Sequence, residues 1–256
     1  MNMSKWVKKS VECLSLTLWL LIPWRSHAQS LQAVAVVAEG TTGGTFDLCG
    51  DTENSTTGQT AVTATCSGSW SDTTGSGSGS GTVTATYGYV RSAGSASETI
   101  VVATGGTQTQ TTLGGYFQYI MTFPSLTTGA SLRAILTVQG SLTGDPTSVI
   151  SSNIGMTVNG VTGQSCQVVA PMLVGSCTAD ASVNPGDFVQ IQGTLDIYPT
   201  ATINPNSTGS TSATMNYDGK QKKNGARFAF VLVDSSGRVI NSVPIVTASG
   251  ATYPTK

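Results

Sequence analysis

Apolar and polar residues alternate with a period of two along most of this chain, the pattern of half-buried β-strands. The clearest case is the segment 113–142, where two alternating runs flank a turn that contains Pro124 and Gly129. The apolar face comprises Phe117, Tyr119, Met121 and Phe123 in the first run and Leu132, Ala134, Leu136 and Val138 in the second. We therefore expect a β-hairpin in the middle of a sandwich, paired with strands at 186–197 or 226–233.

Other segments extend this pattern. The nearly continuous apolar runs 31–38 and 226–233 predict central strands, and Asn159-Gly160 predicts a two-residue hairpin turn. The low-complexity segment 67–81, SGSWSDTTGSGSGSG, is expected to be a flexible Gly/Ser loop. No stretch after residue 28 keeps apolar residues at helical spacing over three turns, so we expect almost no helix.

These short strands, separated by Gly, Pro and Asn, predict an all-β fold. The arrangement that fits best is an antiparallel, jelly-roll-like β-sandwich that forms a single domain over residues 29–256. A β-solenoid is the alternative architecture. The absence of a fixed repeat weakens it.

Residues 1–28 have the features of a cleavable signal peptide. Lys5, Lys8 and Lys9 precede the apolar run 13–24, and the small residues Ser26 and Ala28 place the expected cut before Gln29. No later segment is apolar enough to be predicted as a membrane span. We therefore expect a secreted protein, either extracellular or periplasmic.

Removal of this leader changes the inventory of side chains. It takes away His27, the only histidine, and leaves Trp70 as the only tryptophan. From Gln29 onward, eight basic side chains face twelve acidic ones, and eight minus twelve gives a net charge of −4. This weakly acidic surface argues against nucleic acid as a partner.

Four cysteines remain after the leader, Cys49, Cys66, Cys166 and Cys177, which is an even number in a chain expected to be exported. We expect two disulfides. Of the three connectivities, Cys49–Cys66 and Cys166–Cys177 are favoured because each pair is close in sequence and flanks a turn-rich segment. Neither pair forms a C-x-x-C motif, so a structural role is favoured over redox chemistry.

Two groups of residues could bind a ligand. Asp47, Asp51 and Glu53 form the most acidic segment and could supply oxygens to calcium, the only cofactor that the sequence suggests. Their spacing matches no EF-hand, however, and solvated loop carboxylates are the simpler interpretation. Trp70 and Tyr116, the latter on the polar face of its strand, could stack on sugars of surface glycans. The alternative for Trp70 is that the indole folds back onto its own loop or onto the Cys49–Cys66 bridge.

No catalytic residues are predicted. Without histidine, the mature chain cannot build a Ser-His-Asp triad or a Cys-His pair. Two carboxylates are sufficient for glycoside hydrolysis, but no motif selects a pair among the nine Asp and three Glu that follow the leader.

Three segments resemble uncharacterised bacterial secreted proteins related to the PEP-CTERM-type exported proteins. They are the strand near Tyr87-Gly88, the segment 114–144 with its LTVQGSLTG ending, and the C-terminal VLVDSSGRVINSVPIVTASGATYP. In the last segment, Asp234, Gly237, Ser249, Gly250 and Tyr253 match the Asp-x-x-Gly turn and Ser-Gly-x-x-Tyr ending of that class, whereas its Pro-Glu-Pro sorting signal does not follow. The resemblance implies a β-sandwich, export and no known enzyme activity.

We therefore expect a non-enzymatic, secreted structural or interaction protein of the cell surface or extracellular matrix, with surface glycans or other envelope proteins as partners. The alternatives are a carbohydrate-binding module and a glycan hydrolase with paired carboxylates. Functional residues are expected in the loops around 47–75 or at 218–225, where packing does not dictate residue type.

Overall fold

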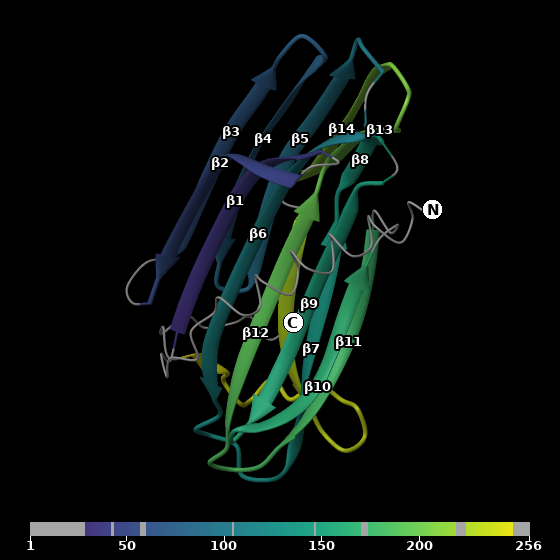
Figure 1. The fold of residues 1–256 in the computed structure, drawn as a ribbon. Coiled ribbons are helices and arrows are strands. Elements are labelled where there is room, and N and C mark those ends of the chain that lie inside the picture. Colours follow the sequence, from purple (N-terminus) through teal and green to yellow (C-terminus); the bar gives the residue numbers. More distant parts are fainter. Residues whose placement is uncertain are drawn as a thin grey trace.

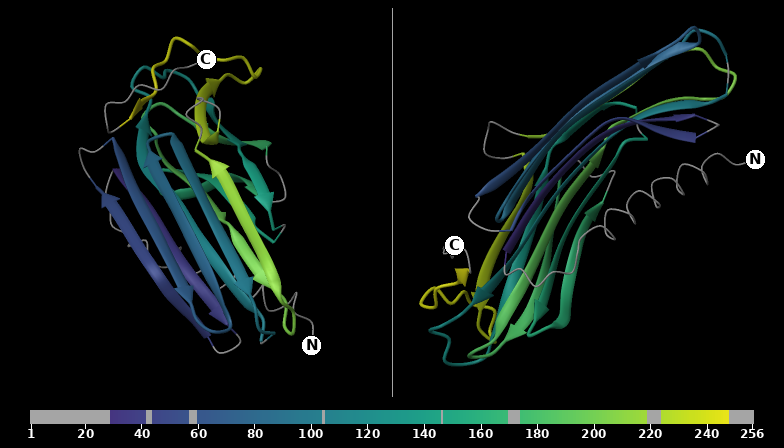
Figure 2. Two further views of the ribbon diagram at one scale, coloured as in Figure 1. Left: turned by 90° about the horizontal axis from the view of Figure 1, so that it is seen from above. Right: turned by 60° about the vertical axis from the view of Figure 1, so that its left-hand side comes forward.

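Two antiparallel sheets stack face to face, and every regular element among the described residues is a strand (Figure 1 and Figure 2). The computed structural model describes residues 29–41, 44–56, 60–103, 105–145, 147–169, 174–218 and 224–247. The predicted leader lies outside these ranges. The expected antiparallel β-sandwich is thus confirmed, and the solenoid is wrong.

The first sheet, called sheet A, has the order β10-β9-β12-β6-β1-β2, with β13 and β16 also paired to β6. Its strands are β1 (Gln29–Thr41), β2 (Gly44–Ser55), β6 (Thr107–Thr122), β9 (Val149–Val158), β10 (Val161–Val169), β12 (Phe188–Tyr198), β13 (Thr200–Ile203) and β16 (Val246–Thr247). The apolar run at 31–38 lies in β1, between β2 and β6, as its pattern predicts.

The second sheet, called sheet B, has the order β11-β7-β15-β5-β14-β8, and the hairpin of β3 and β4 extends it beyond β5. Its strands are β3 (Ala61–Ser71), β4 (Gly75–Thr86), β5 (Tyr89–Ile100), β7 (Ala130–Gln139), β8 (Ser141–Gly144), β11 (Val174–Val183), β14 (Gly209–Tyr217) and β15 (Gly225–Val233). The apolar strand β15 is again central, between β7 and β5.

Large aromatic side chains fill the interior in the middle of the sandwich. Phe117 of sheet A meets Phe228 of sheet B edge to face with ring centres 4.7 Å apart, and Tyr119 meets Phe230 in the same way at 6.1 Å. All four side chains are at most 4 % exposed. Alternation along each strand produces this core because successive side chains of a strand point to opposite faces of the sheet.

The expected hairpin over 113–142 is wrong, although both of its arms are strands. Strand β6 lies in sheet A beside β12, whereas β7 lies in sheet B beside β15, so the turn between them crosses from one sheet to the other. The predicted apolar faces are nevertheless correct, because they face each other across the interior. A connection of seven residues, 123–129, spans the roughly 10 Å between packed sheets.

The expected Gly/Ser loop at 67–81 is also wrong, because it forms most of the β3–β4 hairpin. The repeat GSGSGSG alternates like any strand, with serine outward and glycine inward. A Cβ atom on Gly79 would lie 2.5 Å from the Thr111 hydroxyl oxygen and 2.7 Å from a methyl carbon of Val37, both in sheet A. Glycine is therefore required here by close approach of the opposite sheet.

The two predicted disulfides are confirmed, and both join one sheet to the other. Cys49 of β2 bonds to Cys66 of β3, and Cys166 of β10 bonds to Cys177 of β11. Strands β2 and β3 lie at one side of the sandwich and β10 and β11 at the opposite side (Figure 1). The sheets are thus linked covalently along both edges.

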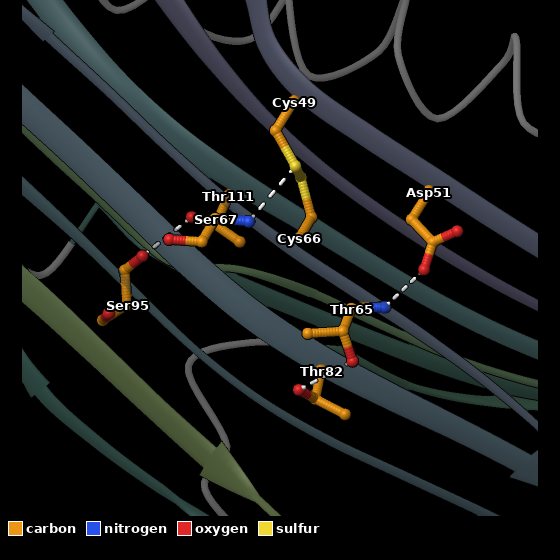
Figure 3. The surroundings of a disulfide bond; sticks show 8 residues. All are labelled: Cys49, Asp51, Thr65, Cys66, Ser67, Thr82, Ser95 and Thr111. Carbon is orange, nitrogen blue, oxygen red and sulfur yellow. Dashed lines mark hydrogen bonds between the residues drawn. A yellow bond between two sulfur atoms is a disulfide. The ribbon is translucent and has the colours of Figure 1, made fainter.

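Side chains of β2 also cover the free edge of β3. The backbone NH of Thr65 donates to the Asp51 carboxylate at 2.7 Å, and that of Ser67 donates to the sulfur of Cys49 at 3.1 Å (Figure 3). Covered NH groups cannot pair with another chain, so this edge is protected from strand addition.

The first and last described strands both pair with β6. Gln29, at the start of β1, pairs with Tyr119 of β6, and Thr247 of β16 pairs with Met121 of the same strand. The turn between β9 and β10 is the predicted Asn159-Gly160 pair, with φ of 48° and 82°. Among the described residues, no helix is long and apolar enough to cross a membrane.

The glycine-rich inner face yields a direct test. Replacing Gly79 by Ala should lower the free energy of unfolding by about 1–3 kcal/mol, because the added methyl group overlaps sheet A. The matched control is Gly155→Ala in β9, where a Cβ atom has open space and the change should be neutral or stabilising by up to about 1 kcal/mol. Equal losses in urea unfolding of the two variants would contradict the close approach of the sheets.

Candidate functional site

The outer face of sheet B carries an uncharged grid of hydroxyl groups. Three successive rows cross the strands β3, β4, β5 and β14, and serine or threonine occupies every position of each row. The rows are Ser71, Ser76, Thr99 and Ser210; Ser69, Ser78, Ser97 and Ser212; and Ser67, Ser80, Ser95 and Thr214. We call these twelve residues the hydroxyl face.

Neighbouring hydroxyls of this face bond to each other across the strands. Ser78 and Ser97 lie 2.8 Å apart, Ser80 and Ser95 3.2 Å, and Thr99 and Ser210 3.0 Å, measured between hydroxyl oxygens. Each hydroxyl can donate once and accept twice, so a bonded pair keeps one donor and several acceptor positions for a ligand. The pairs also restrain the side-chain rotamers, which lowers the entropy that a ligand must overcome.

A shallow cleft of about 640 Å³, wide open to solvent, borders this face. Ser97, Thr99, Ser210 and Ser212 of the hydroxyl face line it, together with Gly144 and Asp145 at the end of β8. This volume lies in the usual range of small-ligand sites, although the lining is far more polar than is usual for them. The cleft therefore suits a ligand recognised by hydrogen bonds.

Asp145 fixes the wall of the cleft. Its Oδ1 accepts hydrogen bonds from the NH of Thr147 at 2.8 Å, and its Oδ2 accepts from the NH of Thr202 at 3.1 Å. The carboxylate thereby ties the turn after β8 to β13 of the other sheet, and the side chain is only 9 % exposed. We assign Asp145 a structural role in shaping the cleft.

A second polar group lies beneath the hydroxyl face, inside the sandwich, and we call it the Glu98 cluster. Glu98 of β5 points inward, is 1 % exposed and accepts a hydrogen bond from the Thr109 hydroxyl of β6 in the opposite sheet. The Thr107 hydroxyl and the Trp70 indole NH also face this carboxyl. The cluster comprises Glu98, Thr107, Thr109, Trp70 and Glu39, which is the cross-strand partner of Thr109.

Gly77 makes room for this cluster. A Cβ atom on Gly77 would lie 2.2 Å from Trp70 Nε1, 2.3 Å from Thr109 Oγ1 and 2.6 Å from Glu98 Oε2. The three polar atoms therefore converge on the space that a side chain would fill. Trp70 Nε1 and two further atoms of the cluster, Glu98 Oε1 and Thr107 Oγ1, are buried without a hydrogen-bond partner.

The pKa of Glu98 is raised above its usual value. Burial is the main cause, and the negative charge of Glu39 adds to it. The hydrogen bond from Thr109 acts in the opposite direction, as do the nearby Thr107 hydroxyl and Trp70 indole. The pKa of Glu39 is raised as well, by burial and by the nearby charge of Asp72. Among the described residues, no basic side chain pairs with the two carboxyls of this cluster.

One other carboxyl has a displaced pKa. Asp196 lies on the outer face of β12, and burial raises its pKa to about 7. Its cross-strand neighbours are Gly114 and Ser151, neither of which carries charge. Asp196 is not part of the Glu98 cluster, but its raised pKa lies within the pH range in which Glu98 would be tested.

The structure does not bring the predicted calcium ligands together. Asp47, Asp51 and Glu53 all lie on β2, and Asp51 is used to accept the hydrogen bond from Thr65. In the described part of the chain, no three acidic, cysteine or histidine side chains form a group that could hold a metal ion. Asp51 and Glu53 share one side of the strand because they are two residues apart, whereas the irregularity between Val37 and Ala38 shifts Asp47 out of that register.

The two predicted sugar-stacking aromatics are not exposed platforms. Trp70 belongs to β3, is half-buried and directs its Nε1 toward Glu98, so it packs on the neighbouring strand and not on a loop. Tyr116 does lie on the outer face of sheet A, but it is only 8 % exposed and its hydroxyl donates to Gln118 Oε1. Burial raises the pKa of this phenol.

The Glu98 cluster and the hydroxyl face are not predicted from the sequence, although the alternation of residues contains a sign of each. Glu98 follows Ala96 and precedes Ile100 at alternate positions, so the period of two places a carboxyl among inward residues. The hydroxyl face follows from the Ser and Thr at every second position of 67–71, 76–80 and 95–99. Of the loop expected at 218–225, residues 219–223 lie outside the described part.

Comparisons with known proteins leave the family open. No protein-family model matches the chain, and no curated protein matches it.

The raised pKa of Glu98 predicts a specific pH dependence. The fold favours the protonated carboxyl, so the contribution of Glu98 to stability is fully present below its unfolded pKa and is lost as the pH rises through the folded pKa. Between pH 4 and pH 8, in buffer with EDTA, the melting temperature of Glu98→Gln should therefore rise by several degrees relative to that of the unsubstituted protein. Glu53→Gln, at an exposed carboxyl, should follow the unsubstituted protein, and parallel curves for all three proteins would disprove the effect.

Proposed function

We propose that this chain is an exported, non-enzymatic interaction protein of the cell surface or extracellular matrix, and that the hydroxyl face is the surface that contacts its partner. The observation that carries the proposal is the uncharged, twelve-position hydroxyl grid beside a polar cleft. The predicted signal peptide and the resemblance to secreted bacterial proteins support export. The two disulfides point to an oxidising compartment.

A neutral glycan is the partner that suits this face best. Hydroxyls on adjacent strands repeat about every 4.8 Å, and rows repeat about every 6.7 Å along the strands. The first repeat is close to the length of one sugar in an extended glycan, so a chain that crosses the strands meets a hydroxyl at each residue. Sugar hydroxyls, like serine hydroxyls, both donate and accept, and neither surface carries a charge to desolvate.

Binding by this face would resemble that of a carbohydrate-binding module in ligand but not in contact chemistry. None of the twelve positions is aromatic, so recognition relies on many hydrogen bonds and not on stacking. Each such bond adds only about 0.5–1.5 kcal/mol net. High affinity therefore requires a polymer or a surface that occupies several rows together.

Charged substitutions on the face test this function. The double variant Ser78→Glu/Ser212→Glu places two carboxylates on one row, separated by β5. It should reduce retention of the protein at least tenfold, both on extracellular matrix and on insoluble neutral polysaccharides such as cellulose, chitin and β-glucan. The cause is the desolvation of each charge without a counterion. Retention is measured as depletion of the protein from solution.

The control is Ser165→Glu/Ser176→Glu, which places the same charges on exposed serines of β10 and β11 at the far side of the sandwich. It should bind like the unsubstituted protein. If both double variants lose binding equally, or if the unsubstituted protein is retained on neither matrix nor polysaccharide, the assignment of the hydroxyl face is wrong.

A further inference from the structure

The glycine-rich end of the sandwich lacks the Phe and Tyr rings that join the sheets at the centre. Between β4, β5 and β6 its interior is lined by Gly77, Gly79, Glu98, Thr109 and Thr111. The sheets meet there through hydrogen bonds, from Thr109 to Glu98 and from the Thr111 hydroxyl to the Ser95 carbonyl at 2.7 Å. Hydrogen bonds of this kind stabilise less than the aromatic packing at the centre.

This end also carries negative charge without a counterion. Glu98 of sheet B and Glu39 of sheet A both adjoin Thr109, and Asp72 lies near Glu39. The described basic side chains lie elsewhere: Arg91 with Asp218, Arg133 with Asp180, Arg227 over the Tyr89 ring, and Arg238 in the turn after β15. Buried carboxylates are normally paired with a basic group or a metal ion.

Unpartnered oxygen atoms within the cluster point to a missing ligand. Glu98 Oε1 and Thr107 Oγ1 are buried without a hydrogen-bond partner, and Thr107 is only 9 % exposed and faces the Glu98 carboxyl. Such buried, unsatisfied oxygens are rare in folded proteins and commonly mark the place of a water or an ion.

We propose that the Glu98 cluster binds a calcium ion between the two sheets. The donors are the carboxylates of Glu98 and Glu39 and the hydroxyls of Thr107 and Thr109. Two bidentate carboxylates and two hydroxyls supply up to six oxygens, and water supplies the rest of the six to eight that calcium takes. Magnesium fits less well, because it demands octahedral geometry and keeps most of its water.

The half-buried side chain of Glu39 at the rim provides the route of entry for the ion. The ion joins sheet B, through Glu98, to sheet A, through the other three donors, and so clamps the end that hydrophobic packing leaves weak. The Trp70 indole NH faces the same carboxylate. Because calcium binds the ionised carboxylate of Glu98, calcium and protons compete for this side chain.

Trp70 provides a local probe of this site. Terbium replaces calcium at oxygen sites and emits when an adjacent indole is excited, and Trp70 is the only tryptophan beyond residue 28. Protein collected from the exported fraction should therefore give terbium emission on selective tryptophan excitation, and added calcium should quench it with a Kd of about 10⁻⁴–10⁻³ M, as in other extracellular modules. Calcium at ten times its Kd should raise the melting temperature by about 3–6 °C.

Variants separate this site from other acidic groups. Glu98→Gln and the rim variant Glu39→Gln should each lose the terbium signal and the thermal shift by calcium, whereas Trp70→Phe should lose the signal and keep the shift. Glu53→Gln, in the acidic segment of β2, should keep both. The proposal is overturned if calcium does not shift the melting temperature, or if the shift persists in both Glu98→Gln and Glu39→Gln. This outcome is independent of binding by the hydroxyl face.

Discussion

The lack of space for any side chain at Gly77 and Gly79 governs the glycine-rich half of this sandwich. Because a Cβ atom at either position would overlap atoms from other strands, these two inward positions of β4 must be glycine, and the sheets approach closely. The same alternation then places serine at every outward position. One short repeat thus generates both a tight polar interior and a hydroxyl-covered exterior, and the two candidate sites are opposite faces of the same strands.

The two halves of the sandwich are held by different forces. Around Phe117, Tyr119, Phe228 and Phe230, aromatic burial supplies the cohesion. At the glycine-rich half, no aromatic rings of the described residues pack against each other between the sheets, and the hydrogen bonds from Thr109 and Thr111 join them. The Cys49–Cys66 and Cys166–Cys177 bonds close both edges, which limits sliding of one sheet past the other.

The sequence was sufficient for the fold class, the central strands, the inward faces of 113–142 and the cysteine pairs, because the pleat of a strand dictates side-chain direction and short spacing favours local pairing. It was insufficient for the partner sheet of β7, because a hairpin and a crossing between sheets bury the same residues. The strand at 75–81 was not predicted because glycine contributes nothing to an apolar pattern. The Glu98 cluster escaped because its members come from β1, β3, β5 and β6, and only packing of two sheets brings them together.

Both ends of the described chain pair with the same strand, β6, and this gives the long axis of the sandwich two unlike ends. Gln29 and Thr247 pair with Tyr119 and Met121, near the last residues of β6, whereas Thr107 and Thr109 lie at its beginning. The strand runs along the length of the sandwich (Figure 1). The first and last described residues therefore lie together near one end of the sandwich, and the glycine-rich half with its hydroxyl rows forms the opposite end.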